Sequence, residues 1–362
     1  MPLRPRPEVE KLAPAAHGGP DEAEFRKAGL NGGEIIDFSV CSNPYMHAPM
    51  MNEIIQEVAI DRLPDSEATE FRERLGGKLS VSPANILAGN GAMEPIRLIA
   101  LAYFGRGDSV IIPEPTFGEY RVACQISGAE ITGQWGKERD NFNHNIEKIA
   151  DLIKKSRPRG VFICNPNNPS GSYLSRQQIT DILDACPETL VVIDEAYISF
   201  VADSWSSLDL IERDNLIIVR SMTKDFALAG LRLGYAVAHQ DIIDVLGRVR
   251  PPWSVNALAQ QAGIAVLKDY DRLETAGREI LKAKQFLVDE FSGLGFSLVP
   301  SRTHFFLMKV TRPGDFRTAL LKQGLLVRDC ASFGLPEYVR IAARTLPECR
   351  QLVNAVKEMK EW

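Results

Sequence analysis

The stretch RSMTKDFALAGLRLG, residues 220–234, follows one apolar run and leads into another, so it connects two expected strands. A lysine placed directly after a buried strand is partly desolvated, which lowers its pKa and leaves an amine that can form an imine. Ser221 and Arg232, on either side of Lys224, offer a hydroxyl and a guanidinium that suit a phosphate group. The alternative is a surface lysine at a helix start and an arginine in a salt bridge. This stretch alone leaves both interpretations open.

Short apolar runs, separated by Gly, Pro, Asn or Asp and often by helical stretches, recur from about residue 86 to residue 235. Runs of this length that are apolar on both faces are typical of strands in a mostly parallel sheet covered by helices. The runs are 86–88, 110–112, 161–164, 190–193, 216–219 and 234–238. Apolar residues at helical spacing over 93–103 predict one of the covering helices. The pattern therefore indicates an α/β domain.

The pattern changes after Pro252, where residues 257–294 contain few helix breakers and predict long helices. Apolar runs then follow at 305–310, 325–328 and 339–342, and Thr345 with Glu348 forms a capping box for a last helix. We expect this part to form a small α+β domain against which the loop-rich N-terminus packs. The predicted division is a large domain at 45–255 and a small domain formed by 1–44 and 256–362.

Composition excludes several classes of function. The chain has 362 residues, of which 45% are hydrophobic and 25% charged, with a formal net charge of -5 and both signs interspersed, so nucleic acid is not an expected partner. Six cysteines without a C-x-x-C spacing and five histidines argue against a metal site and a disulfide framework. The start lacks an apolar signal segment, and the most apolar stretch, 96–104, is too short to span a bilayer. We expect a soluble, cytoplasmic protein with no membrane partner.

Asp194 closes the apolar run within VVIDEAY, residues 191–197. A buried carboxylate needs a cationic partner or several hydrogen-bond donors, and a protonated pyridine nitrogen would serve as that cation. Tyr197, three residues later, could donate to a phenolate oxygen. A helix-capping aspartate beside a core tyrosine is the alternative.

Two loops follow other expected strands. CNPNNPSG, residues 164–171, combines two prolines with asparagines and predicts a stiff loop that holds an amide in place. GNGAM, residues 89–93, places backbone N–H groups at a helix start, where they could bind a phosphate. Each could also be a plain turn. Ligands of open α/β sheets bind at the carboxyl ends of strands, so we expect these segments to meet there.

Taken in order, the glycine-rich turn, the Asn-Pro loop, Asp-x-x-Tyr, Ser-x-x-Lys and Gly-x-Arg resemble fold-type I pyridoxal-phosphate enzymes of the class I/II aminotransferase superfamily. The resemblance covers nearly the whole chain. It implies the aspartate aminotransferase-like α/β fold, in which a large domain has a mostly parallel, seven-stranded-type sheet flanked by helices. It also implies a smaller α+β domain and a homodimer whose active site lies at the two-fold interface.

The resemblance further implies that pyridoxal 5′-phosphate is the cofactor, held as a Schiff base on Lys224, which also shuttles the proton. Asp194 would pair with the ring nitrogen, and Tyr197 and Asn168 with the phenolate oxygen. Phe117 would stack on the pyridine face, or else it is an ordinary core phenylalanine. The catalytic set is Lys224, Asp194 and Tyr197. The cofactor-binding set is Gly91, Ala92, Phe117, Asn168, Asp194, Tyr197, Ser221, Lys224 and Arg232, with the amides of Gly91 and Ala92, Ser221 and Arg232 on the phosphate.

Within the superfamily the chain is most similar to the threonine-phosphate decarboxylases of cobalamin biosynthesis, whose near relatives are the histidinol-phosphate aminotransferases. The segments that carry this similarity are AHGG at 16–19, DFS at 37–39, NP at 43–44, FGEY at 117–120, PWSVN at 252–256 and LVRDCA at 326–331. The substrate-binding residues that it implies are His17, Gly18, Asn168, Arg328 and Arg340. His17 has the alternative of a solvated loop histidine.

The chain departs from this family pattern at several positions. Leu63 stands where relatives have a tyrosine that reaches the cofactor phosphate of the other subunit, so that contact is in doubt. His304 stands where many relatives have asparagine, and the turn at 91–93 lacks the usual hydroxyl residue. These departures affect the assignment to a subfamily more than the expectation of a pyridoxal-phosphate cofactor.

Three hypotheses for function follow. The first is decarboxylation of O-phospho-L-threonine, or a close analogue such as O-phosphoserine, to an aminoalcohol phosphate for the cobalamin nucleotide loop. The second is transamination of histidinol phosphate or an aromatic or phosphorylated amino acid. The third is a regulatory or binding module, against which the intact Lys224, Asp194 and Arg232 argue.

Overall fold

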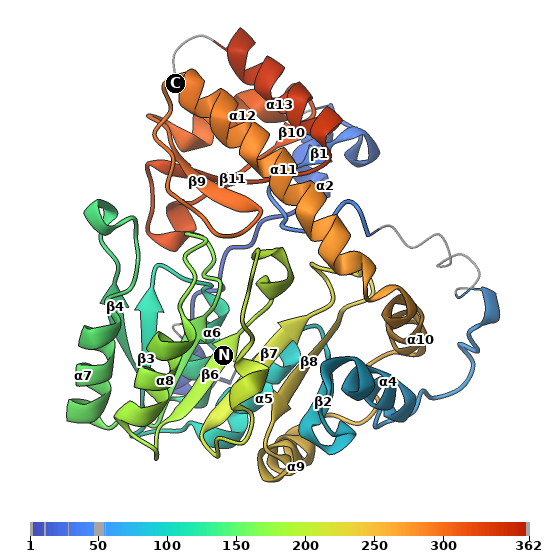
Figure 1. The fold of residues 1–362 in the computed structure, drawn as a ribbon, viewed down its shortest axis with the longest axis vertical. Coiled ribbons are helices and arrows are strands. Elements are labelled where there is room, and N and C mark those ends of the chain that lie inside the picture. The colour runs from blue at the N-terminus through green and yellow to red at the C-terminus, as the bar shows by residue number, and fades with distance from the viewer. Residues whose placement is uncertain (1–2, 11, 28, 47–53, 55, 360–362) are drawn as a thin grey trace.

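A seven-stranded sheet forms the centre of the computed structural model, which describes residues 3–10, 12–27, 29–46, 54 and 56–359 (Figure 1). The strands, in spatial order, are β2 (Ile86–Asn90), β8 (Leu233–Ala238), β7 (Leu216–Ser221), β6 (Leu190–Asp194), β5 (Gly160–Cys164), β3 (Ser109–Glu114) and β4 (Glu130–Trp135). All neighbours are parallel except at β8, which runs antiparallel to β2 and β7. The predicted fold class, with its mostly parallel seven-stranded sheet, is confirmed.

Helices cover both faces of this sheet because its strands are apolar on both sides. The strand residues alternate between two hydrophobic clusters, one on each face. The helices on one face are α4 (Thr69–Leu79), α7 (Ile146–Ser156), α8 (Arg176–Ala185) and α10 (Ala257–Val266). The helices on the other face are α5 (Met93–Tyr103), α6 (Glu119–Ser127) and α9 (Gln240–Val249).

A second, smaller layer lies above the carboxyl edge of the sheet in the view of Figure 1. It contains an antiparallel sheet in the order β11 (Arg328–Asp329), β12 (Tyr338–Ala342), β9 (Phe305–Lys309). A separate parallel pair joins β1 (Ile36–Asp37) to β10 (Leu325–Leu326). The helices here are α11 (Arg272–Gly293), α12 (Pro313–Leu321) and α13 (Leu346–Glu358).

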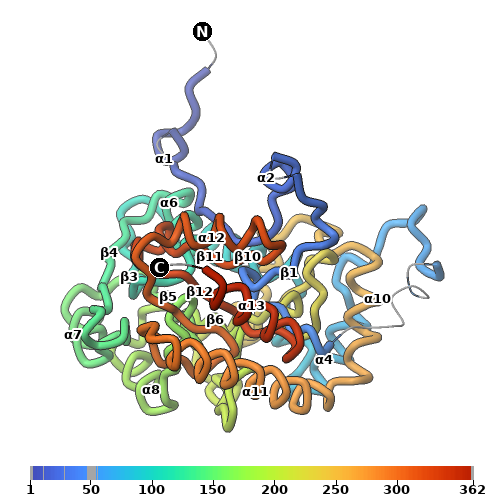
Figure 2. The backbone as a smooth tube through the Cα atoms, turned by 90° about the horizontal axis from the view of Figure 1, so that it is seen from above, coloured from blue at the N-terminus to red at the C-terminus, as the bar shows by residue number. Residues whose placement is uncertain are grey.

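The N-terminal segment contributes the short helices α1 (Pro7–Glu10) and α2 (Glu22–Lys27) before β1. Phe38 and Cys41 are buried with β9 and β12, and Phe25 packs on Leu321 and Leu326, so this segment packs against the C-terminal part, as expected. Figure 2 shows α1 beside α6, so the same segment also reaches the large domain. Single helical turns lie at Gly32–Glu34, Pro83–Asn85, Glu138–Asp140, Ile198–Phe200, Ser207–Leu210, Leu267–Asp269 and Ala331–Phe333.

The chain passes from one hydrophobic core to the other within α11. Leu273 and Ala276, at its start, pack with the large sheet together with α10, whereas Ile280 and Leu287 pack with the small domain. The predicted division at residue 256 stays a prediction, because α11 belongs to both cores and α10 packs on the sheet.

The sequence prediction missed strand β4. Its six residues carry apolar side chains only at Ile131 and Trp135, and it is the sheet's edge, with no fully buried residue. An edge strand of this kind is specified by its pairing with β3 rather than by its own hydrophobicity. Within the described part of the chain, no helix combines the length and apolarity that crossing a bilayer requires.

Candidate active site

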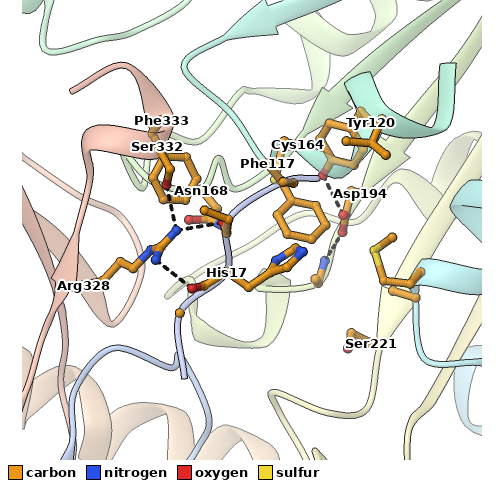
Figure 3. A pocket seen from close by; sticks show the side chains of 18 of the residues that line it. His17, Phe117, Tyr120, Cys164, Asn168, Asp194, Ser221, Arg328, Ser332 and Phe333 are labelled. Atoms are coloured by element: carbon orange, nitrogen blue, oxygen red, sulfur yellow. Dashed lines mark hydrogen bonds between the residues drawn. The ribbon is translucent and has the colours of Figure 1, made fainter. Parts of the chain in front are cut away.

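A cavity of about 640 Å³ lies between the two domains, where the central strands end. Every predicted site residue except Gly91 lines it, although these residues are spread from position 17 to position 340 of the chain. Figure 3 shows several of them from close by, with His17, Phe117 and Asp194 facing the same space. The structure therefore brings the predicted residues together, and the roles assigned to them remain proposals.

Lys224 enters the cavity from the connection between β7 and β8. Its backbone carbonyl accepts a hydrogen bond from the N–H of Asn43 at 2.8 Å, which fixes the connection against the N-terminal segment. Burial lowers the pKa of the Lys224 amine, and the nearby guanidinium groups of Arg340 and Arg232 lower it further. A larger share of this amine is therefore neutral and nucleophilic than in an exposed lysine.

Asp194 ends β6 and is buried. The Tyr120 hydroxyl donates to its Oδ2 at 2.6 Å, and the Ala196 N–H donates to its Oδ1 at 2.9 Å (Figure 3). Burial raises the pKa of Asp194, and the Tyr120 hydrogen bond partly offsets that rise. No ion pair to Asp194 forms within the described residues, so its carboxylate faces the cavity without a cation. This is the environment that a protonated pyridine nitrogen would complete.

A small polar cradle lies where β8 starts. The hydroxyls of Ser221 and Thr223 are 2.6 Å apart and both line the cavity, together with Arg232 and Ala92. Gly91 has a φ of +68°, a left-handed conformation that favours glycine, and a Cβ there would lie 2.8 Å from a guanidinium nitrogen of Arg232. Thr223 was not among the predicted residues. The set of hydroxyls, amide and guanidinium suits a phosphate group.

One detail of the predicted phosphate site is wrong. The Gly91 N–H donates to the Arg232 carbonyl at 2.9 Å, so it is already engaged and cannot also serve a phosphate. Gly91 contributes by its shape instead, because it makes room for the Arg232 side chain. The Ala92 amide remains available for the predicted contact.

Arg340 occupies the small-domain side of the cavity. Its guanidinium donates to the side-chain oxygen of Asn168 and to the Ser39 carbonyl, the latter at 2.6 Å, while its buried Nε has no protein partner in the described part of the chain. Register pairs Arg328 with Arg340 on neighbouring strands, so both guanidinium groups project into the same cavity. No described carboxylate forms an ion pair with either of them. Two unneutralised arginines on one wall indicate an anionic ligand.

The remaining predicted residues lie on or below the cavity floor. Tyr197 is buried, and burial raises its pKa well above the usual range. Phe117 lies edge-to-face on Tyr120, with ring centroids 5.5 Å apart. Below them, His304 is fully buried with no hydrogen-bond partner for either ring nitrogen among the described residues, and burial lowers its pKa to about 3. This histidine is therefore neutral and packs as an aromatic ring, 3.8 Å from Phe200 between centroids.

The residues at 13–19, which we call the N-terminal strap, run over the cavity mouth. Arg328 donates to the carbonyls of Ala16 and His17 at 2.8 and 2.7 Å, and the His17 ring contacts Glu119 at 2.8 Å. Glu119 and Tyr120 follow Phe117 closely in the chain, but no local pattern there assigns either of them a role. Leu63, in contrast, is exposed and does not line the cavity. Within one chain it therefore makes no contact with the site.

The fold and this cavity are those of an α/β enzyme with a buried lysine and a buried aspartate at the carboxyl edge of its central sheet. The chain belongs to the family described as aminotransferase class I and II, whose sequence pattern matches residues 34–356. Its cofactor is pyridoxal 5′-phosphate. The lysine, the uncompensated aspartate and the polar cradle fit this molecule's aldehyde, ring nitrogen and phosphate, respectively.

Named relatives carry two activities. The chain is 37% identical over 313 residues to a histidinol-phosphate aminotransferase of Thermoanaerobacter pseudethanolicus, covering 85% of this chain and 87% of that protein. A solved histidinol-phosphate aminotransferase from Clostridium acetobutylicum has a TM-score of 0.80 at 26% identity, covering 89% of this chain and 98% of that one. A solved L-threonine-O-3-phosphate decarboxylase from Porphyromonas gingivalis has a TM-score of 0.80 at 28% identity, with the same coverage of 89% and 98%.

Proposed function

We propose that this enzyme transfers the amino group of histidinol phosphate, or of a closely related phosphorylated amine, to a 2-oxo acid. The main support for an anionic substrate is the pair Arg328 and Arg340. Both face the cavity without a described carboxylate partner. The names of the curated relatives support transamination. Decarboxylation, the first hypothesis from the sequence, is not confirmed and becomes the second candidate.

The two arginines also suit the second substrate of a transaminase. A 2-oxo acid such as 2-oxoglutarate carries two carboxylates. The same pair of guanidinium groups could bind the phosphate of histidinol phosphate in one half of the reaction and these carboxylates in the other. Arg340 is the deeper of the two, since it is buried beside Asn168 and its Nε lacks a protein partner in the described residues. Arg328 lies nearer the mouth, where the strap covers it.

The pyridoxal cofactor, when bound, supplies an electron sink that stabilises negative charge at the substrate Cα. Lys224 is the group that takes the Cα proton, and its lowered pKa keeps the amine ready to accept it. Asp194 would pair with the protonated ring nitrogen of the cofactor, and Tyr197 and Asn168 would hydrogen-bond to its phenolate oxygen. The small domain and the strap limit access of water to these groups.

The second candidate is decarboxylation of O-phospho-L-threonine. It is supported by the strap sequence AHGG, by PWSVN at 252–256, and by the 28% identity to a solved decarboxylase. The same residues serve both reactions, because the outcome depends on which bond to Cα stands perpendicular to the cofactor ring. Arg328 and Arg340 would then hold the phosphate and the carboxylate at once.

The test uses the reconstituted enzyme with each substrate, with and without 2-oxoglutarate. Transamination predicts that histidinol phosphate is consumed beyond one equivalent per active site only when 2-oxoglutarate is present, with glutamate formed in equal amount. Release of carbon dioxide and aminopropanol phosphate from O-phosphothreonine without any oxo acid would establish the second candidate instead. An enzyme that turns over neither compound would refute both.

A further inference from the structure

We propose that Glu119, with Arg97 as its counter-ion, is a positioning residue that sets the His17 ring at the cavity mouth to bind the phosphate of the substrate. This inference rests on the proposed function, because it concerns the phosphorylated substrate of the same site. Its elements come from distant parts of the sequence, namely the strap, α5 and the start of α6. Figure 3 shows His17 between Phe117 and Arg328.

Glu119 is the buried centre of the arrangement. Its side chain is only 8% exposed, and each of its oxygens has one cationic or polar partner. Oε1 contacts His17 Nε2 at 2.8 Å, and Oε2 accepts from Arg97 at 2.6 Å. A buried carboxylate is stable only when its oxygens are satisfied in this way. Its position as the first residue of α6 adds a favourable interaction with the helix dipole.

The contact with Glu119 determines how the imidazole can bind a ligand. A carboxylate only accepts hydrogen bonds, so His17 Nε2 must carry a proton. Nδ1 has no hydrogen-bond partner in the described part of the chain and is therefore the atom left for a ligand. A phosphate hydroxyl bound there can donate a hydrogen bond to Nδ1, so the ring would lie between Glu119 and the phosphate. Arg97 balances the negative charge of Glu119, so the pair does not repel a phosphate bound at His17.

The backbone of the strap is fixed from the other side. Arg328 donates to the carbonyls of Ala16 and His17 and to the Ser332 hydroxyl, at 2.8, 2.7 and 2.7 Å. Gly18 is closely packed, because a Cβ there would lie 3.2 Å from both the Arg328 Cδ and the Ser39 carbonyl oxygen. The small domain therefore holds the backbone next to His17, while the large domain holds its ring.

This arrangement assigns a selective role to Glu119. Binding of the reacting amine depends on Lys224 and the cofactor, which Glu119 does not contact. Only the part of the substrate that reaches the mouth should depend on the orientation of His17. A phosphate at that end is the group that His17 Nδ1 and the neighbouring Arg328 would both bind.

The experiment measures binding, so it does not depend on which reaction is catalysed. Calorimetry on the enzyme loaded with the aminated cofactor, pyridoxamine 5′-phosphate, which does not react with amines, compares inorganic phosphate, histidinol phosphate and histidinol as ligands of wild type, Glu119→Gln, His17→Asn and the double variant. Glu24→Gln is the matched control, because Glu24 also pairs with an arginine, Arg317, but lies outside the cavity. Cofactor absorbance and thermal unfolding of each variant verify that the fold is kept.

We expect Glu119→Gln to weaken the binding of histidinol phosphate and of inorganic phosphate about tenfold, which is the effect of losing one charge-assisted hydrogen bond. The affinity for histidinol should be unchanged. In the His17→Asn background the same substitution should have no further effect, because the two residues act as one unit. Equal weakening of histidinol and its phosphate, or additive losses in the double variant, would overturn the proposal.

Should Glu119→Gln fail to fold, His17→Asn decides alone, since its side chain is half exposed and its removal leaves the core intact. Unchanged phosphate binding in that variant overturns the proposal. If wild type binds the phosphorylated ligands but turns over none of them, the proposed reaction fails while the inference on Glu119 is still tested.

Discussion

Replacing Tyr120 by phenylalanine should move the acid limb of the enzyme's pH profile. The Tyr120 hydroxyl donates to Asp194 at 2.6 Å inside the core, and a hydrogen bond to a charged group contributes about 1.5–3 kcal/mol. One pKa unit corresponds to about 1.4 kcal/mol, so losing this donor should raise the pKa of Asp194 by about one to two units. The packing of the ring is kept, since a phenylalanine in its place would still stack on Phe162, as Tyr120 does at 5.1 Å between centroids.

The direction of the shift in the pH profile follows from the proposed role of the Asp194 carboxylate. Burial already raises the pKa of Asp194, and the Tyr120 hydrogen bond lowers it, so removing the hydroxyl raises the pKa further. In the proposed function, activity requires ionised Asp194 and would be lost as the pH falls through that pKa. The acid limb of kcat/KM should therefore shift to higher pH, by about one unit or more.

The assay is kcat/KM from pH 5 to 9 for wild type and Tyr120→Phe. Tyr338→Phe is the control, because its hydroxyl donates to Glu138 at 2.7 Å outside the cavity. In the proposed arrangement Asp194 and the ring nitrogen would titrate as a pair, so the measured pKa values would belong to the pair. An acid limb in the same place as that of wild type would refute the idea that Tyr120 supports the ionised Asp194.

Three further predictions concern the same structure. Lys224→Ala should lose all turnover and leave no cofactor label after borohydride reduction, as judged by mass spectrometry; a label on another lysine would contradict the assignment. Glu195→Gln should lower the free energy of unfolding by about 3–5 kcal/mol in denaturant titration, because it leaves the buried Arg220 guanidinium, now bonded at 2.7 Å, without its charge partner; a change below about 1 kcal/mol would show that the pair is dispensable. The cofactor-loaded enzyme should scatter light as a homodimer at micromolar concentration, and a clean monomer would be evidence against an interface around Leu63.

The predicted chemistry at Asp194 and Lys224 could be located from the sequence because each follows an apolar run directly. In a parallel sheet the end of such a run is the edge where ligands bind, so a local pattern determines a position in space. The same reasoning placed Asn168 correctly in the cavity. Its bond to Arg340 depends on the small domain's position, which no local pattern encodes.

Residues whose role depends on tertiary contacts could not be predicted from the sequence. Arg97 interrupts the apolar pattern of a helix, and only the folded chain shows that it meets Glu119. Strand β4 has too few apolar residues to be recognised before its pairing with β3 is known. The reversed direction of β8 could have been inferred, since the helix-free connection at 222–232 is shorter than a parallel crossover usually needs.

The antiparallel direction of β8 has a mechanical consequence. Because β8 starts at the edge where β7 ends, the loop between them carries both Lys224 and Arg232. In the proposed arrangement, this one loop thus binds the cofactor at two points, its aldehyde and its phosphate. Because both residues lie on one loop of the large sheet, a movement of the small domain would leave the distance between these two attachment points unchanged.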